Sequence, residues 1–220
     1  MRSIIEKLAA LRAKDVEFKV FGAGAHCYKL NPPLAEKEVQ RVEQKYRFSV
    51  PKDYRWFLTS VGNGGAGPFY GIFPLEMNDD GHDLASWEKV GLIGPLDQAF
   101  PHTEAWNLPA SFWKEEPDPG GDVTEEDEDK LWEAWDEKLE EKYWKPSVMQ
   151  GAIPICHEGC AQRDWLVVTG PQAGTMWCDM RADNEGIAPL KNKDGTPMTF
   201  SDWYLDWLGS NLSGERYAGA

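Results

Sequence analysis

Long apolar runs, cysteines and histidines are all scarce in this sequence of 220 residues. No apolar stretch approaches the roughly 18 to 20 residues that a membrane-spanning helix needs. Charges interrupt residues 1–13, which therefore lack the apolar stretch of a signal peptide. Four cysteines in a chain of this length do not resemble a disulfide framework. We therefore expect a cytoplasmic protein that neither spans nor lies on a membrane.

Basic residues are also few, with 23 Lys and Arg against 37 Asp and Glu and a net charge of −14. Residues 115–141 hold 14 carboxylates and two lysines, a local charge of −12, so the rest of the chain is nearly neutral. Nucleic acids and anionic membranes attract basic patches, and we expect neither as a partner. An acidic surface favours a basic protein partner.

The periodicity of apolar residues predicts helices and strands. The predicted helices span residues 4–11, then run from a cap at Asn31 to Tyr46, from Pro51 to a left-handed stop at Gly62, from Thr124 to Trp144 and from a cap at Ser201 to Gly209. The predicted strands are 16–20, 27–30, 69–75, 151–156, 164–169 and 175–180, with a hairpin at 170–174. Loops are expected in 101–121, and a frayed end from Ser210 to Ala220. Helices flank strands rather than alternate with them, which predicts an α+β fold with a central, mostly antiparallel sheet.

The glycine-rich segment 62–67 matches the dinucleotide-binding spacing G-x-G-x-x-G. That chemistry needs the glycines between a strand and the start of a helix, where backbone amides face the phosphates. Here they follow a helix and precede a strand. We therefore interpret the segment as a helix stop and tight turn, and expect no nucleotide cofactor.

Residues 156–160 contain Cys156, His157 and Cys160. Two thiolates and an imidazole could hold a metal, but a closed zinc site needs a fourth ligand. Cys156 and His157 could also form a nucleophile and base. Adjacent strand residues point to opposite faces, however, so the two side chains would not meet. A tight turn between strands is favoured, and we predict no catalytic residues, metal or cofactor.

Acidic residues surround an apolar stripe in the helix predicted near residues 124–144. Trp132, Trp135, Leu139 and Tyr143 share one face. The carboxylates are either a solvated face or a partner-binding face. Our hypothesis is that residues 122–141 dock through the stripe and turn their acids towards a basic partner. The candidate partner-binding residues are Glu125, Glu126, Asp127, Glu128, Asp129 and Trp132.

Residues 34–75 resemble the start of the SUKH superfamily, which is related to a fungal regulator of cell-wall assembly. The resemblance lies in the helix of residues 36–46, then Phe48 to Leu58 with its Pro51-x-Asp53-Tyr54 turn, the Gly62-Asn63-Gly64-Gly65 stop and the segment 70–75. Later stretches are also similar to the family, namely 153–155, 164–168, 174–177 and 200–208.

The resemblance implies an α+β fold and a non-catalytic, protein-binding role. Bacterial members of the superfamily are regarded as immunity proteins that neutralise toxins, many of them nucleases. We therefore expect an immunity protein for a basic, nuclease-type toxin. The alternatives are a cytoplasmic scaffold or regulator of the fungal type and, with less support, an enzyme using Cys156 and His157. Residues 1–220 are expected to form one domain, with an N-terminal extension, 1–30, and an acidic insertion, 101–145.

Overall fold

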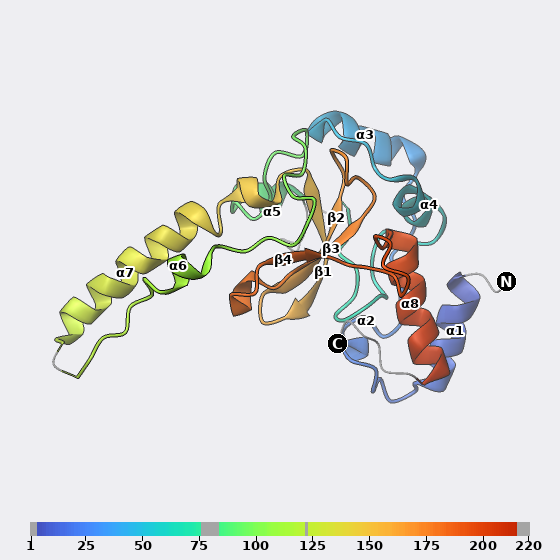
Figure 1. Cartoon of the computed structure of the whole chain (residues 1–220). Coiled ribbons are helices and arrows are strands. Elements are labelled where there is room, and N and C mark those ends of the chain that lie inside the picture. The colour runs from blue at the N-terminus through green and yellow to red at the C-terminus, as the bar shows by residue number, and fades with distance from the viewer. Residues whose placement is uncertain (1–3, 76–83, 122, 215–220) are drawn as a thin grey trace.

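The computed structural model describes residues 4–75, 84–121 and 123–214, and its architecture is α+β (Figure 1). Four strands in this part of the chain form one sheet in the order β1-β2-β3-β4, and each neighbouring pair is antiparallel. They are β1 (Ala152–Gly159), β2 (Gln162–Val167), β3 (Met176–Asp179) and β4 (Ile187–Pro189). The predicted fold class is confirmed.

Helices surround this sheet unevenly. In Figure 1, α1, α4 and α8 lie on one side of the sheet, and α6 and α7 extend away from the other. Among the described helices, none combines the length and apolar composition that crossing a membrane would require. The helices are α1 (Ile4–Lys14), α2 (Ala23–His26), α3 (Glu36–Tyr46), α4 (Lys52–Ser60), α5 (Leu84–Lys89), α6 (Ala110–Trp113), α7 (Glu125–Lys142) and α8 (Phe200–Ser213), with 3-10 turns η1 (Pro146–Met149) and η2 (Arg181–Asp183).

The two faces of the sheet have different neighbours, because strand side chains alternate. Asp164 opposes Cys178 on the face towards α8, and the Trp203 indole donates a hydrogen bond to Asp164 at 2.8 Å. Trp165 opposes Trp177 on the other face, where the Trp177 ring lies 4.8 Å from that of Phe100.

Aromatic side chains fill the space between α4 and α8. The ring of Phe57 lies 5.1 Å from Phe200 and 5.0 Å from Tyr204, and all three are buried. The Tyr204 hydroxyl donates to the carbonyl of Ala66 at 2.9 Å, which satisfies its polar end. Large aromatic side chains therefore supply much of the buried apolar area here.

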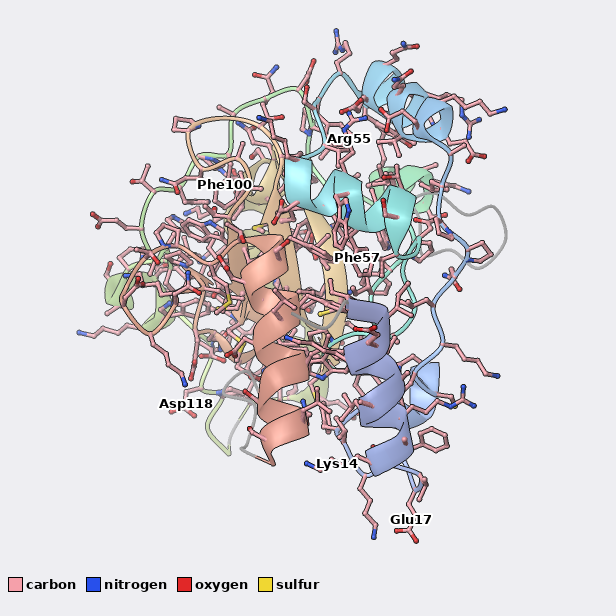
Figure 2. The ribbon with its side chains drawn as sticks, turned by 90° about the vertical axis from the view of Figure 1, so that its right-hand side faces the viewer. Lys14, Glu17, Arg55, Phe57, Phe100 and Asp118 are labelled. Carbon is pink, nitrogen blue, oxygen red and sulfur yellow. The ribbon has the colours of Figure 1, made fainter. Side chains whose placement is uncertain are left out.

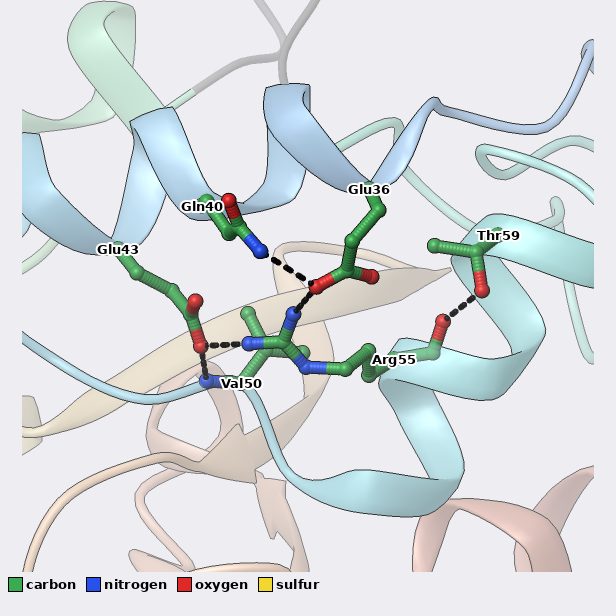
Figure 3. A network of polar contacts seen from close by, with 6 residues as sticks. All are labelled: Glu36, Gln40, Glu43, Val50, Arg55 and Thr59. Carbon is green, nitrogen blue, oxygen red and sulfur yellow. Dashed lines mark hydrogen bonds and ion pairs between the residues drawn. The ribbon is translucent and has the colours of Figure 1, made fainter.

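A polar network fixes α3 against α4 (Figure 3). The Arg55 guanidinium pairs with the carboxylates of Glu36 and Glu43. Glu43 also accepts the backbone N–H of Val50 at 2.7 Å. Arg55 of α4 thus joins two turns of α3, and Glu43 also holds the segment that leads into α4.

The glycine-rich turn after α4 is structural, as predicted. Gly64 and Gly65 have φ of 81° and 96°, and Gly65 exchanges backbone hydrogen bonds of 2.9 and 2.7 Å with Ile72. The Ala66 N–H donates to Lys29 O at 2.7 Å. Backbone acceptors thus occupy the amides that a phosphate would need.

The predicted left-handed stop at Gly62 is wrong. Gly62 is not among the positive-φ residues, and its N–H donates to Phe57 O at 3.0 Å, so the chain reverses only at Gly64. Glycine suits position 62 for another reason, since a Cβ there would lie 2.8 Å from Asn31 O.

Three predicted strands are not strands. Residues 16–20 form a turn because the Asp15 carboxylate accepts the N–H groups of Lys19 and Val20, at 2.7 and 3.1 Å. In 27–30, Cys27 and Tyr28 have positive φ, and Leu30 makes one isolated bridge. In 69–75, Ile72 makes isolated bridges to Gly65 and Cys156. The last two segments therefore lie along other backbone without forming ladders.

Helix ends also differ from the sequence prediction. Asn31 does not cap α3, because its amide donates to Asn63 O at 3.0 Å, while Glu38 accepts the Ala35 N–H at 2.7 Å. Thr199, not Ser201, caps α8, which continues through Gly209 to Ser213. Packing of α8 against α1 offsets the weak helix propensity of glycine. The frayed end expected over 210–220 is helical to Ser213, and 215–220 lie outside the described residues.

We predict opposite effects for two Gly-to-Ala changes. In Gly64→Ala the new Cβ would lie 2.6 Å from Ile72 O at a φ of 81°, so unfolding free energy should fall by more than about 1 kcal/mol. In the matched control, Gly209→Ala, nothing lies within 4 Å and stability should rise by about 0.5–1 kcal/mol. Denaturant unfolding measures the free energy of unfolding of both variants. Equal effects of the two changes would contradict the structural role of the turn at Gly64.

Candidate functional site: an acidic helical arm

Residues 101–145, here called the acidic arm, leave the sheet and return to it. Figure 1 shows α6 and α7 side by side, extending away from the strands. The ring of Phe112 on α6 lies 4.9 Å from that of Trp135 on α7. The short helix α6 was not predicted within the expected loop. It forms where Phe112 packs on α7.

Aromatic contacts hold the arm together from its middle to its base. Trp113 lies 5.0 Å from Tyr143, and Tyr143 lies 5.7 Å from Trp106 (ring centroids). Trp135 and Tyr143 are buried, while Trp132 and Leu139 are half-buried. The predicted stripe thus faces inward, and Trp132 keeps part of its surface open.

The carboxylates at the start of α7 all face solvent. Glu125, Glu126, Asp127, Glu128 and Asp129 are exposed. Thr124 caps the helix as predicted, its hydroxyl accepting the N–H of Asp127 at 3.3 Å. Negatively charged side chains in the first turn of a helix interact favourably with the helix dipole. That effect accounts for some negative charge at this end, but not for the acids along the rest of α7.

Both lysines within residues 115–141 form ion pairs inside the arm. Lys130 lies 2.8 Å from Glu126, one turn away, and Lys138 lies 3.4 Å from Glu115. Exposed pairs of this kind contribute little stability, about 0–1 kcal/mol. Residues 101–145 as a whole hold 15 carboxylates and five lysines, so a large surplus of carboxylates remains without a cation from the arm.

Arg181 fixes the base of the arm to the sheet. Its guanidinium is 3% exposed, pairs with Asp179 of β3 at 2.7 Å and donates to the backbone carbonyl of Tyr143 at 2.7 Å. The ring of Trp144 covers it, 4.8 Å from the guanidinium carbon. A positive charge at the C-terminus of a helix also interacts favourably with the helix dipole. These contacts set the direction in which α7 leaves the sheet.

The side chains of Cys156 and His157 lie in different surroundings. Cys156 is buried beside Asp164, whereas the His157 ring stacks on Tyr70 at 4.7 Å. Burial, and then the negative charge of Asp164, raise the pKa of the Cys156 thiol well above its usual value. Within the described residues no group of three or more His, Cys, Asp or Glu side chains could hold a metal ion. The tight turn expected over residues 156–160 is shorter, because β1 continues to Gly159 and only Cys160 and Ala161 form the turn.

A carboxyl pair lies on the sheet face towards α8. Asp164 of β2 is 2% exposed and Glu158 of β1 is half-buried. Burial raises the pKa of Glu158 to about 7. Burial, followed by the negative charge of Glu158, raises the pKa of Asp164 well above its usual value. The two acids therefore hold a proton near neutral pH.

Arg181, Glu158 and Asp164 are functional candidates that the sequence did not predict. Asp164 begins the predicted strand 164–169, and the sequence predicts no other role for it. Alternation along β1 and β2 could have placed Glu158 and Asp164 on one face together with Cys156. Asp179 lies two residues before Arg181, but no local pattern marks Arg181 as the anchor of the arm, because the carbonyl of Tyr143 is 38 residues away in the sequence.

Comparison with known proteins gives one match. The model of the family described as SMI1 / KNR4 family (SUKH-1) matches residues 33–195, which is most of the chain and includes the acidic arm. No curated protein matches this sequence. No solved structure matches it either.

We predict that Arg181→Leu destabilises the protein and loosens the arm. Removing the guanidinium leaves the buried Asp179 carboxylate unpaired, which should lower the unfolding free energy by about 3 kcal/mol. Trypsin should then cleave α7 faster at Lys130, Lys138 and Lys142. The control is Arg12→Leu, at an exposed position of α1. A loss no larger than in the control, with unchanged cleavage, would contradict the anchoring role.

We also predict that Glu158→Gln changes how stability depends on pH. Glu158 titrates near 4.5 when unfolded and about 7 when folded, so the native state holds an extra proton between these values. Unfolding free energy should therefore fall as pH rises through about 7, and fall less in the variant. Denaturant unfolding at about pH 5 and about pH 8 measures this difference. The prediction is wrong if the unfolding free energies of the native protein and of the variant change by the same amount between these two pH values.

Proposed function

The chain belongs to the SMI1 / KNR4 family (SUKH-1), and on this basis we propose that it acts by binding a protein partner rather than by catalysis. Membership of this family is consistent with an immunity or a regulatory role. We propose the first, namely a bacterial immunity protein that binds and neutralises a basic, nuclease-type toxin.

The acidic arm carries this proposal. Its carboxylates at 125–129 face solvent, while its aromatic stripe packs inward. Folding needs the stripe but does not need this surplus of negative charge. Charge complementarity raises the association rate and selects among partners, so a surface of this kind suits a basic protein.

A nuclease suits the arm because it must itself carry a basic groove to hold phosphates. An acidic helix that stands away from its own sheet could occupy that groove in place of the nucleic acid. Trp132, half-buried beside the acids, adds aromatic surface of the sort that anchors interfaces. The proposed contact residues are therefore Glu125, Glu126, Asp127, Glu128, Asp129 and Trp132.

The domain organisation follows the same proposal. We propose one domain in which residues 101–145 are an insertion and 1–30 an extension. The extension packs on the closing helix, since Lys14 donates to the backbone carbonyls of Asn211 and Leu212 at 3.1 and 2.8 Å. We further propose that the protein works in the cytoplasm. A toxin gene beside its own would favour the immunity role, whereas its absence would favour a regulator.

We predict that neutralising the arm slows binding without unfolding the protein. The variant changes Glu125, Glu126 and Glu128 to Gln and Asp129 to Asn. Rim charges act mainly on association, so its association rate with the toxin encoded beside the gene should fall about tenfold or more at low salt. The dependence of that rate on salt should also flatten, with unfolding free energy nearly unchanged.

The control removes the same number of charges elsewhere. It changes four exposed glutamates outside the arm to Gln, namely Glu6, Glu17, Glu88 and Glu185. Stopped-flow kinetics at low and moderate salt compares the two variants. If both slow association equally, only net charge matters. If neither does, the acids at the start of α7 are a solvated face and the binding surface lies elsewhere.

A further inference from the structure

An open groove lies on the sheet face opposite to the attachment of the acidic arm. Its volume is about 1570 Å³, and it runs between α8, the ends of β1 and β2, and the segment after α1. Figure 2 shows α1 beside α8, with Lys14 at the lower end of α1 near one end of this groove. A volume above the roughly 300–1,000 Å³ of small-molecule pockets suits a length of polypeptide better than a metabolite.

Part of the groove wall is apolar. Leu190, Met198 and Leu205 line it, and each is only partly buried. At its rim Phe21 is 52% exposed, and its ring lies 5.4 Å from the ring of Tyr70, which is 38% exposed. Exposed aromatic side chains beside a groove are favoured anchors for a protein partner.

A fixed loop presents Phe21. Asp15 accepts the hydroxyl of Tyr28 at 2.6 Å besides two backbone N–H groups of the loop. Within it Phe18 has a φ of 54°, a left-handed conformation that is unfavourable for a bulky residue. The loop is thus held in a strained form that leaves Phe21 outside the core.

The floor of the groove carries the carboxyl pair, Glu158 and Asp164. Among the described residues neither forms an ion pair with a cationic side chain. Arg163, next to Asp164 in the strand, interacts with Asp179 and Arg181. Asp179 and Arg181 belong to the face of the sheet that holds the arm. The positive charge of Arg163 therefore does not neutralise Glu158 and Asp164.

The lysines around the groove do not reach this pair. Lys14 donates to two carbonyls at the end of α8, and Lys19 pairs with Glu17. Lys191 and Lys193 are exposed on the loop before α8, where water screens their charge. The half-buried acids are screened less, so the deep part of the groove favours a cation.

We propose that this groove binds a segment of a protein partner that carries an arginine or lysine flanked by apolar residues. The apolar neighbours lie against Phe21 and the partly buried wall. The cationic head reaches the half-buried Glu158, whose carboxylate fits a guanidinium fork, whereas Asp164 is 2% exposed and already accepts the Trp203 indole N–H. This surface is separate from the acidic arm, so the inference does not depend on the proposed function.

The ionisation of Glu158 at the floor of the groove supports the binding of a cationic side chain there. Because the pKa of Glu158 is about 7, the pair gains negative charge between pH 6 and 8, and a cation should bind more tightly across about that range. The other titratable and charged groups that line the groove or act on Glu158 are Cys178 and Asp179 from β3, Asp202 and Asp206 from α8, Lys14, Asp15 and Lys19 after α1, and Lys191 and Lys193.

The test is an NMR titration of the full chain with the capped tripeptide acetyl-Leu-Arg-Leu-amide. Its matched probe has citrulline, the neutral isostere, in place of arginine. We expect shifts at residues that line the groove, with affinity for the arginine peptide about fivefold to tenfold higher at pH 8 than for the citrulline peptide. The preference should shrink at pH 6.

Two variants assign the interaction to the groove. Glu158→Gln should remove both the preference for arginine and its pH dependence, whereas Phe21→Ser should weaken both peptides alike. The control is Glu185→Gln, at an exposed position outside the groove. It should change neither the preference for arginine nor the affinity for the two peptides.

Three results of the peptide titration would overturn the inference. They are equal affinity for the two peptides at pH 8, shifts confined to α7 with none in the groove, and no shifts at either pH. Concentration-dependent shifts of the groove without peptide would also overturn it, since a second copy of the chain would then be the occupant.

Discussion

The buried guanidinium of Arg181 is the interaction on which the arrangement of this molecule depends. It joins Asp179 of the sheet, the carbonyl that ends α7 and the ring of Trp144. A buried charge is tolerated only when it is paired and fully hydrogen-bonded, so these groups have little freedom to move apart. The direction of a helix that bears half of the net charge is thus set by one side chain at its base.

Charge and aromatic packing together give the arm its form. Carboxylates cannot be buried without partners, and α7 has far more of them than the arm has lysines. Only a narrow stripe of α7 is apolar enough to be covered, and it meets Phe112, Trp113 and Trp106. The helix consequently stands away from the sheet with its acids in water. That geometry leaves a negative surface exposed without distorting the core.

The sequence predicted those parts of the molecule that local patterns determine. Alternating residues and the hairpin at 170–174 predicted β2 and β3, and Thr124 with Asp127 predicted the start of α7. The resemblance over residues 34–75 agrees with the family match over 33–195. The strand predicted over residues 16–20 was wrong because the Asp15 carboxylate accepts backbone N–H groups of this segment and so stabilises a turn.

Other features depend on residues far apart in the chain. The pairing of Glu158 with Asp164 and the groove above them require α8 to fold across the sheet, and α8 passes through Gly209 only because packing supports it. The anchoring of the arm likewise joins Arg181 to Tyr143. The acidic face was visible in the sequence as a charge surplus. Its isolation from the sheet was not, because that depends on where the aromatic stripe finds partners.

The central claim is that the acidic face of α7 meets a basic protein. Zero-length carbodiimide cross-linking of the complex with the toxin encoded beside the gene, mapped by mass spectrometry, tests it most directly. The reaction joins a carboxylate to an amine only where they are in contact. The account predicts that links to toxin lysines start from Glu125, Glu126, Asp127, Glu128 or Asp129. Links that start only from carboxylates outside residues 101–145 would contradict it.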